Sequence, residues 1–596
     1  MILTALNQYY DRLVDKPDPD TGRLRVPEFG FSEEKIGYVL VLSTDGQLVD
    51  VINHLDSSGK KSLPKKMSVP RPEKRTSGIQ PNFLWDKSAY VLGVQANPDK
   101  KAGKETPWVE SAKTFDAFRQ RHIEILEACD DEGLSALVKF LQQWRFESID
   151  ESPCKHDMLH ANLVFQLDGD RCYLHDRETV KKQWALLLAS SNQAVESHCL
   201  VTGKRERIAR LHPSIKGVFG GQSSGGSIVS FNAESYESYG KSQGENAPVS
   251  ELAAFKYTTV LNYLLNRDNK RCLSVGDAST VFWAVAADGG QTQKAEQLFM
   301  QVVNPSDDGE AAQLNPLVEK ISQGQPLKEV APDISPDTQF YVLGLAPNAA
   351  RLSIRYWLDT NFGELAQHMA DHFTDLSLDP PAWNKPPSVF RLLIELVPFR
   401  SGKKSNAKDI PPHLAGEMMR SILTGDRYPH SLLAQLVLRI RTDGHISSLR
   451  IAMIKAVLHR DCRKLNKEEV PMGLDESYDN EAYQTGRLFA VLERIQSSAI
   501  KGANATITDR YFGTASTVPY SVFPRLLAGS KNHLSKIRKN KPGYAVNLDK
   551  DITGIIARLP PEFSKHFSIE DQGKFCIGYY HQRNVKNSNA VNNSDS

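Results

Sequence analysis

The sequence contains no Cys-x-x-Cys pair, although it has seven cysteines. These cysteines are scattered and odd in number, at positions 129, 154, 172, 199, 272, 462 and 576. A disulfide framework shows an even number of cysteines at characteristic spacings, and a cysteine zinc site needs close pairs. We therefore expect neither a disulfide-stabilised secreted fold nor a cysteine zinc centre.

Long apolar runs are also missing, because no stretch approaches the roughly 20 apolar residues that span a bilayer. The first residues, MILTALNQYYDRLVDK, lack the basic start, apolar core and cleavage site of a signal peptide. Apolar residues make up 40% of the chain and charged residues 24%, close to the globular average. These features predict a soluble, cytoplasmic protein without a membrane partner, and 596 residues predict several domains.

No complete hydrolase or P-loop motif is present, although GVFGGQSSGGSIVSFN at 217–232 contains a G-x-S-x-G between Gly221 and Gly225. A nucleophile elbow needs a strand before the serine and a helix after it, whereas a strand-like alternation and further loop follow here. A P-loop needs a lysine where Gly226 and Ser227 stand. The stretch therefore predicts a strand–loop–strand with exposed backbone amides and small hydroxyls, or simply a flexible surface turn.

The sequence has two pairs of histidines with the spacing of metal ligands, but no third ligand is evident for either pair. His156 and His160, like His368 and His372, have the spacing that places two ligands on one face of a helix. Neither pair has a glutamate after its first histidine, and His175-Asp176 lacks the accompanying motifs of metal-dependent nucleases. We expect no metal and no cofactor. A metal-dependent nuclease acting on DNA or RNA, with an unrecognised histidine and carboxylate cluster, remains the alternative to a non-catalytic protein.

Positive charge is present and unevenly distributed, although the formal net charge is only +2. Residues 59–104 carry eleven Lys or Arg against three acids, and residues 525–541 carry six cations and no acid. Four prolines between Lys60 and Phe83 predict an extended loop there, and the second region has helical spacing. Both are candidates for binding a nucleic-acid backbone, and the alternative is a solvated surface. The candidate residues are Lys60, Lys61, Lys65, Lys66, Arg71, Lys74, Arg75, Lys531, Lys536, Arg538 and Lys539.

Periodicity predicts an α+β fold. Residues 36–52 and 162–176 alternate apolar and polar residues around Asp45-Gly46 and Asp168-Gly169, which predicts two antiparallel hairpins. Residues 114–144 between them, and most of the chain after Pro248, have helical spacing. We expect a mixed α/β domain at 1–245, a mainly helical middle region at 246–470 and a C-terminal helical bundle at 471–596.

Six separated blocks resemble one family, the large subunit of the type I-C CRISPR surveillance complex, Cascade. They are IKGVFGGQSSGGSIVSFN, SYGKSQGENAPVSELAAFKYTTVLNYLL, LGLAPNAARLSIRYW, AYQTGRLFAVLERIQ, NATITDRYFGTASTVPYSVFP and CIGYYHQR, which follow one another over nearly the whole chain. The resemblance implies a non-catalytic subunit with a CRISPR RNA, other Cascade subunits, double-stranded target DNA and a recruited helicase-nuclease as partners.

The resemblance also assigns roles within the chain. The large subunit reads the short protospacer-adjacent motif (PAM) in duplex DNA and promotes R-loop formation, so the glycine- and serine-rich stretch becomes the candidate PAM-binding element. Its candidate contact residues are Gly221, Gln222, Ser223, Ser224 and Asn232. The first basic region would hold flanking duplex or the RNA handle. Phe83, Trp85 and Tyr90 would pack in a core rather than stack on bases.

Two further expectations come from the same resemblance. Arg351 and Arg355, taken as one helical turn apart, would face RNA or a partner subunit, or form structural ion pairs. The family also makes its C-terminal region separately, as a small subunit, from an internal start in the same reading frame. Met472 lies at the expected domain boundary and is the candidate start.

Overall fold

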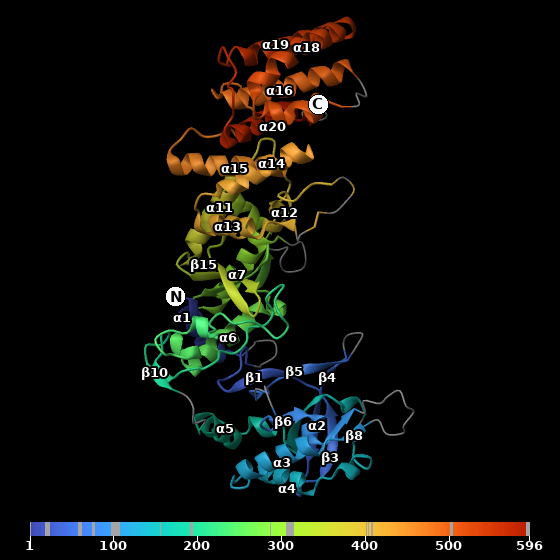
Figure 1. Cartoon of the computed structure of the whole chain (residues 1–596), viewed down its shortest axis with the longest axis vertical. Coiled ribbons are helices and arrows are strands. Elements are labelled where there is room, and N and C mark those ends of the chain that lie inside the picture. Colours follow the sequence, from blue (N-terminus) through green and yellow to red (C-terminus); the bar gives the residue numbers. More distant parts are fainter. Residues whose placement is uncertain are drawn as a thin grey trace. The chain divides into compact units, whose positions relative to one another are not determined.

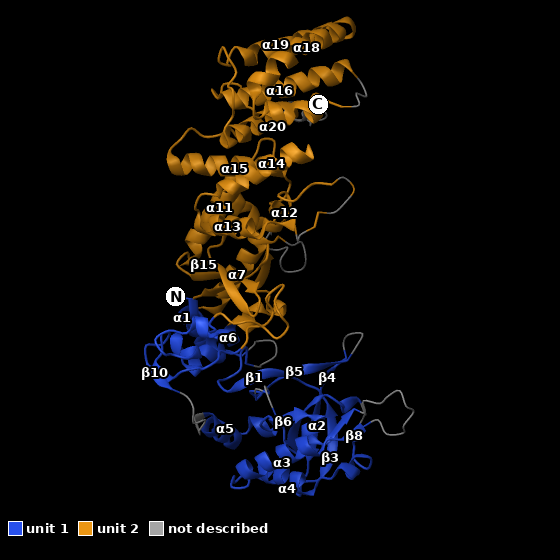
Figure 2. Ribbon diagram, viewed as in Figure 1, with its two compact units in different colours: residues 1–213, 229–260 blue, residues 214–228, 261–596 orange. Residues whose placement is uncertain are grey.

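The computed structural model divides into two compact units, formed by residues 1–213 with 229–260 and by residues 214–228 with 261–596 (Figure 2). It describes residues 2–17, 24–57, 62–73, 75, 78–96, 108–154, 156–190, 195–286, 288–305, 315–400, 402, 405–406, 409–500 and 505–591. Strands concentrate in the first two thirds of the chain and helices in the last third, so the α+β prediction is confirmed. The expected boundaries at 245 and 470 remain predictions.

A four-stranded sheet forms the centre of unit 1, in the order β3 (Leu48–Asn53), β2 (Tyr38–Leu42), β9 (Asn162–Leu167) and β6 (Trp85–Lys87). The first predicted hairpin is confirmed, because β2 and β3 are antiparallel and Gly46 turns the chain with a φ of +79°. The second hairpin is reduced to one bridge between Gln166 and Tyr173. Its return strand is lost because the buried Leu174 starts a 3-10 helix instead.

Helices and a second sheet cover this central sheet. One hydrophobic cluster joins β2 and β9 to α3 (Ala112–Leu126) and α4 (Glu132–Gln143). A smaller cluster joins Val39, Val164 and Trp85 to a three-stranded sheet of β1 (Phe31–Ile36), β5 (Leu63–Pro70) and β4 (Leu55–Asp56). Phe83 and Trp85 are buried, which confirms the expected core packing. The short elements α2 (Ser88–Val91), β7 (Val94–Ala96) and β8 (Trp108–Glu110) complete this part.

The rest of unit 1 consists of helices and one short hairpin. These elements are α1 (Ile2–Val14), α5 (Glu178–Ser190), β10 (Glu196–His198), β11 (Arg205–Arg207) and the first part of α6 (Glu251–Leu265). Tyr10 of α1 packs edge-to-face on Phe255 of α6, with ring centroids 5.8 Å apart. Asn7 Nδ2 donates a hydrogen bond of 3.2 Å to the Ala253 carbonyl, so α1 is fixed to α6 by both apolar and polar contacts.

Unit 2 begins with an antiparallel sheet that the sequence did not predict. Its strands follow chain order, β12 (Cys272–Val275), β13 (Ala278–Val285), β14 (Gln339–Asn348) and β15 (Arg351–Asn361). The expectation of helical spacing for Arg351 and Arg355 is therefore wrong. β-branched and aromatic residues favour a strand here, and a bulge where Leu345 pairs with Ile354 and Gly344 with Tyr356 leaves Arg355 unpaired in the ladder. Arg355 forms an ion pair of 2.5 Å with Asp277.

Helices pack on this sheet and continue to the C-terminus (Figure 1). The first group is α7 (Gly289–Val303), α9 (Asn315–Ser322), α10 (Leu327–Val330), α11 (Phe362–Leu376), α12 (Val389–Ile394), α13 (Pro412–Thr424), α14 (His430–Asp443) and α15 (Ser448–Leu465). The C-terminal group is α16 (Glu481–Ala499), α17 (Ile507–Ala515), α18 (Pro519–Asn540), α19 (Pro542–Ile556) and α20 (Ile569–Val591). One hydrophobic cluster runs through both groups, so the expected C-terminal bundle shares its core with the middle helices.

The closest helix pair in the C-terminal group is α16 and α20. A Cβ on Gly486 would lie 2.1 Å from the Phe575 carbonyl oxygen, and a Cβ on Gly578 would lie 2.1 Å from that of Tyr483. Only glycine permits this backbone approach. Within the described part of the chain, none of the helices combines the length and apolar character needed to cross a membrane.

Candidate nucleic-acid interface

Residues 214–228, here called the Gly/Ser loop, form a closed loop in unit 2. Ile215 and Gly226 exchange two backbone hydrogen bonds of 2.9 and 2.8 Å, which close the base of the loop. Gly217, Gly220 and Gly225 have φ values of +87°, +73° and +90°, a region that side chains disfavour. A Cβ on Gly225 would also lie 2.8 Å from the Ile215 carbonyl oxygen. The glycines are thus required by the tight path of the backbone.

Two turns bring the polar residues of the loop to its tip. The Gly221 N–H donates to the Val218 carbonyl and the Gly225 N–H donates to the Gln222 carbonyl, each at 3.0 Å. The side chains of Gln222, Ser223 and Ser224 are exposed, and Ser224 Oγ lies 3.5 Å from Gln222 Oε1. The predicted flanking strands are replaced by single bridges, because the loop turns back too tightly for a ladder.

The loop lies against the β14–β15 hairpin. The Ser227 N–H donates to the Ala350 carbonyl at 3.2 Å, and the Leu352 N–H donates to the Ser227 carbonyl at 2.9 Å. A Cβ on Gly220 would lie 3.6 Å from Pro347 Cγ, so the loop backbone approaches β14. The hairpin tip is exposed at Asn348 and has Ala349 at a φ of +53°. The sheet therefore holds two adjacent loop tips in fixed positions.

A further hydrogen bond fixes the apolar residue of the loop. The Phe219 N–H donates to Ser279 Oγ at 2.8 Å, while 51% of the Phe219 side chain stays exposed. Asn232, the remaining residue assigned to this site from the sequence, belongs to unit 1 and is exposed. Its part in the site stays a prediction. The geometry of the loop itself offers short polar groups and one aromatic ring on a rigid base.

The first basic region contains a strand rather than the predicted extended loop. Lys65 and Lys66 lie on β5 and are exposed, while Pro64 and Pro70 lie near its two ends, where a strand tolerates proline. Cross-strand pairing places Lys35 of β1 opposite Lys66. Lys35 is exposed on the same face of the sheet as Lys66, and only knowledge of the register identifies it. Lys60, Lys61 and Lys74 lie outside the described residues.

Arg71 and Arg75 differ from these lysines. Arg71 is half-buried after the end of β5, where its N–H donates to the Gly30 carbonyl at 2.8 Å. Arg75 forms an ion pair with the buried Asp86, and its guanidinium lies 4.2 Å from the centroid of the Tyr90 ring. These contacts make Arg75 a structural side chain, so we leave it out of the nucleic-acid surface proposed below.

The second basic region covers α18 from Arg525 to its end at Asn540, as its helical spacing predicted, together with Lys541. Its buried face consists of apolar residues such as Leu526, Leu534 and Ile537, which pack into the C-terminal helices. Lys531, Lys536, Arg538 and Lys539 are exposed on the remaining surface. Arg538 lies 3.6 Å from Asp549 of α19, which neutralises part of its charge. The helix thus presents a broad basic surface rather than a single stripe.

His368 and His372 have structural partners, and His175 is buried. His372 is buried, its Nδ1 contacts the Tyr428 hydroxyl, and burial lowers its pKa to about 3. His368 Nδ1 lies 2.8 Å from the Leu423 carbonyl oxygen. His175 is also buried, and burial lowers its pKa to about 4. The described residues contain no group of three or more His, Cys, Asp or Glu that would hold a metal ion. The side chain of His156 lies outside them.

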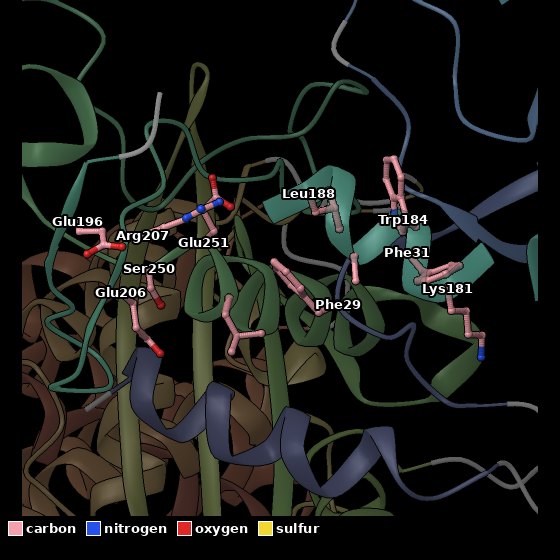
Figure 3. A pocket seen from close by; sticks show the side chains of 12 residues that line it. Phe29, Phe31, Lys181, Trp184, Leu188, Glu196, Glu206, Arg207, Ser250 and Glu251 are labelled. Atoms are coloured by element: carbon pink, nitrogen blue, oxygen red, sulfur yellow. The ribbon is translucent and has the colours of Figure 1, made fainter. Parts of the chain in front are cut away.

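A pocket of about 450 Å³ lies in unit 1, and none of the site residues predicted from the sequence lines it (Figure 3). Its apolar wall includes Phe29, Phe31 and Trp184, and Trp184 Nε1 donates to the Gly30 carbonyl at 2.7 Å. Three glutamates and two cations also line the pocket, namely Glu196, Glu206, Glu251, Lys181 and Arg207. The excess of carboxylates makes the pocket a poor receptor for phosphate groups.

A family model described as CRISPR-associated protein (Cas_Csd1) matches residues 6–586, which is nearly the whole chain. No curated protein matches the sequence.

Proposed function

We propose, from the premise that the chain belongs to the Cas_Csd1 family of CRISPR-associated proteins, that it is the non-catalytic large subunit of a type I-C Cascade complex. In this role it binds a CRISPR RNA and other Cascade subunits, reads the PAM of double-stranded target DNA, and promotes R-loop formation. It then offers a surface to a recruited helicase-nuclease. Sequence recognition of the target is left to base pairing with the RNA.

The observation that carries this proposal is the anchored Gly/Ser loop. Its backbone hydrogen bonds to the β14–β15 hairpin fix its position, and its exposed Gln222, Ser223 and Ser224 are slender and polar. Slender polar groups on a closely approaching backbone suit the minor groove, which is about 6 Å wide. Gln222 would contact base edges, while the glycines would allow the backbone to approach the duplex.

PAM reading by such a loop has a large effect because R-loop formation is nearly balanced. The RNA–DNA hybrid is about as stable as the DNA duplex that it replaces. A contribution of a few kcal/mol at the first base pairs therefore decides whether unwinding proceeds. A rigid loop supplies this contribution efficiently, because its ordering cost is already met in the folded protein.

The two basic surfaces would hold nucleic-acid backbone. Lys66 and the newly identified Lys35 lie opposite one another and form one exposed surface. Lys60, Lys61, Lys65, Arg71 and Lys74 are the further candidate residues of this basic region. This surface would bind flanking duplex or the RNA handle through phosphate contacts. The exposed cations of α18 would track the displaced DNA strand, which needs no sequence reading.

We further propose that Met472 starts a separately made small subunit. The backbone carbonyls of Met472 and of the residues after it accept hydrogen bonds from different parts of unit 2. The Met472 carbonyl accepts from the Asp379 N–H at 2.9 Å, whereas the Gly473 carbonyl accepts from the Tyr483 hydroxyl at 3.3 Å. The Tyr478 carbonyl likewise accepts from Gln484 Nε2 at 2.7 Å. Residues after Met472 therefore bond to α16 and would stay with the C-terminal fragment.

The proposal is tested by reconstitution. The chain is co-expressed with the other Cascade genes and a CRISPR array, and the purified complex is offered matched duplexes that differ only in the PAM. We expect the chain to co-purify with an RNA of defined length and the complex to bind the PAM duplex at least tenfold more tightly. A chain that purifies without RNA, or equal binding of the two duplexes, would overturn the proposal.

The nuclease alternative is tested separately. The purified chain is incubated with labelled DNA and RNA and with Mg²⁺ or Mn²⁺. Cleavage that is lost on substitution of a histidine or carboxylate of this chain would replace the non-catalytic proposal.

A further inference from the structure

The segment after the Gly/Ser loop forms a hydrogen-bonded turn in unit 1. The Lys241 N–H donates to the Ser238 carbonyl at 3.0 Å and closes the turn. The Asn246 side chain spans the base of the turn, because Oδ1 accepts from the Ser238 N–H at 3.0 Å and Nδ2 donates to the Lys241 carbonyl at 3.1 Å. The turn is therefore held from both sides by one amide side chain.

The base of the turn is itself fixed to the body of unit 1. A Cβ on Gly244 would lie 2.1 Å from the Ala209 carbonyl oxygen, so the two backbones touch at this point. Arg210 Nε donates to Gln243 Oε1 at 2.7 Å, and the Gln243 N–H donates to Glu237 Oε1 at 3.1 Å. The turn has little freedom to change its conformation.

Tyr239 occupies an unfavourable position at the tip of this turn. Its φ is +55° and that of Gly240 is +67°, the combination of a type I′ turn, in which glycine or asparagine is preferred at the first position. The Tyr239 side chain is 98% exposed. A bulky residue thus adopts a backbone conformation that it disfavours, and its ring gains no packing within the chain.

The surroundings of the ring indicate its partner. A hot-spot residue of a protein interface lies at the centre of a packed apolar area, whereas the turn neighbours of Tyr239 are Ser238, Gly240, Lys241 and Ser242. A single nucleobase needs only one flat aromatic face, which does not depend on the neighbouring charges of Lys241, Glu237 and Glu245. Tyr236, three residues earlier, adds a second ring that is 46% exposed.

We propose that Tyr239, presented by a fixed turn, is a stacking platform for an unpaired nucleobase of DNA or RNA. This inference rests on the proposed function, because only a nucleic-acid-binding protein would use such a platform. Stacking on aromatic side chains tolerates any base, so Tyr239 would hold a nucleotide that has been separated from its pair without reading its identity. The backbone turn that presents the ring is fixed before binding, so binding orders only the side chain.

The first test measures binding of the full-length chain to single-stranded oligonucleotides of one sequence, made as DNA and as RNA. Tyr239→Ala should weaken binding of one or both by about 5- to 150-fold, the range for loss of one stacked base, whereas Tyr239→Phe should bind like the wild type. The arm with the larger loss identifies the strand that is stacked. Leu186→Ala, which removes another exposed side chain of unit 1, is the matched control.

The second test separates stacking from a structural role. Tyr239→Asn keeps a residue that tolerates positive φ but has no ring, so it should raise the melting temperature while weakening binding as much as Tyr239→Ala. A structural role predicts the reverse, a lower melting temperature in both variants. An abasic site at the stacked position should weaken wild-type binding and remove the difference between wild type and Tyr239→Ala.

The outcomes are distinguishable from failure of the proposed function. Wild-type binding that Tyr239→Ala leaves unchanged would overturn this inference alone. Unchanged nucleic-acid binding with reduced assembly into the complex would show a protein partner instead. A wild-type chain that binds neither DNA nor RNA would overturn this inference and the proposed function together.

Discussion

At the scale of single residues, the tip of the Gly/Ser loop offers the sharpest test of PAM reading. Replacing Gln222 and Ser223 by alanine should weaken PAM-dependent binding by about 1 to 3 kcal/mol, the usual cost of removing a contact to a base. Binding to DNA without a PAM should hardly change, because the backbone contacts remain. Affinities of the reconstituted complex for both duplexes measure the effect.

A control for this double variant is Gln323→Ala, which removes an exposed glutamine elsewhere in unit 2. Its affinities should equal those of the wild type. Equal losses on both duplexes in the Gln222 and Ser223 variant would show that the loop contributes to binding without reading the PAM.

A buried histidine makes the stability of unit 1 depend on pH. His122 Nδ1 lies 2.7 Å from the Phe118 carbonyl and must donate to it, so Nε2 accepts the Leu84 N–H at 2.9 Å. Burial, the largest cause, lowers the pKa of His122 to about 3. Leu84 has a φ of +62°, so this hydrogen bond holds a strained backbone position.

The two pKa values of His122 determine whether acidification raises or lowers the free energy of unfolding. In the folded state the His122 ring takes up a proton only near pH 3, whereas in the unfolded state it does so near pH 6.5. The contribution of His122 to the free energy of unfolding is therefore complete above pH 6.5 and is lost as the pH falls toward 3. The difference in unfolding free energy between wild type and His122→Gln should shrink by about 1.4 kcal/mol per pH unit below 6.5. Denaturant titrations at pH 7.5, 6 and 5 measure it. A constant difference would contradict the assignment.

Particular residues show what the sequence could predict at this scale. Phe83 and Trp85 were expected in a core because they lead into an alternating strand, and both are buried. The ion pair of Arg75 could not be predicted, because its partner Asp86 lies eleven residues away and no local pattern joins them. The path of the Gly/Ser loop likewise depends on bonds to residues 350 and 352, which sequence periodicity cannot reveal.

At the scale of elements, β1 and β5 present lysines from neighbouring strands. Cross-strand pairing places Lys35 opposite Lys66, and like charges opposite one another destabilise a sheet. Replacing Lys60, Lys61, Lys65 and Lys66 by glutamine should reduce the magnitude of the salt slope of duplex binding by about 0.9 for each phosphate that is no longer neutralised. Binding constants between 50 and about 300 mM salt give the slope.

The matched control is Lys294→Gln, because Lys294 already forms an ion pair of 2.6 Å with Asp333. Its slope should equal that of the wild type. An unmoved slope in the fourfold variant would mean that this basic region is only a solvated surface.

Elements were predictable where local signals were strong. The Asp-Gly turn flanked by alternating residues identified the β2–β3 hairpin, and apolar spacing identified α18. The sheet of unit 2 was missed because β13 and β14 are buried on both faces and read as apolar runs without alternation. Strands that are buried on both faces resemble buried helices in sequence. Because helices precede and follow β13 and β14 in the chain, the whole region was predicted to be mainly helical.

At the scale of the whole molecule, the gene should yield two polypeptides. The segment from Met472 to Ser596 has sixteen Lys or Arg against twelve Asp or Glu. Its helices pack on one another, above all α16 on α20. Expression of the untagged gene should give a second band of about 14 kDa. Mass spectrometry of complexes from wild-type and Met472→Leu genes should find the fragment only in the first.

The structure adds a condition to this prediction. A Cβ on Gly573 of α20 would lie 3.1 to 3.2 Å from side chains of Leu433, Ile454 and Leu458, so α20 packs closely on α14 and α15. A free fragment would uncover this apolar face. We therefore expect the fragment to remain in the complex during gel filtration. A fragment with an unchanged N-terminus in Met472→Leu would sink the assignment of the start.

The pairing of Ser227 with β15 has a consequence for solution behaviour. β15 is eleven residues long and lies at the edge of its sheet, where unpaired backbone groups invite strands of other molecules. The Gly/Ser loop occupies that edge at Leu352. Substitutions that release the loop, such as a β-branched residue at Gly225, would uncover this edge and promote aggregation. Substitutions at the loop tip would leave the edge of β15 covered. The glycines that fix the path of the loop, in contrast, also protect the protein against aggregation through this edge.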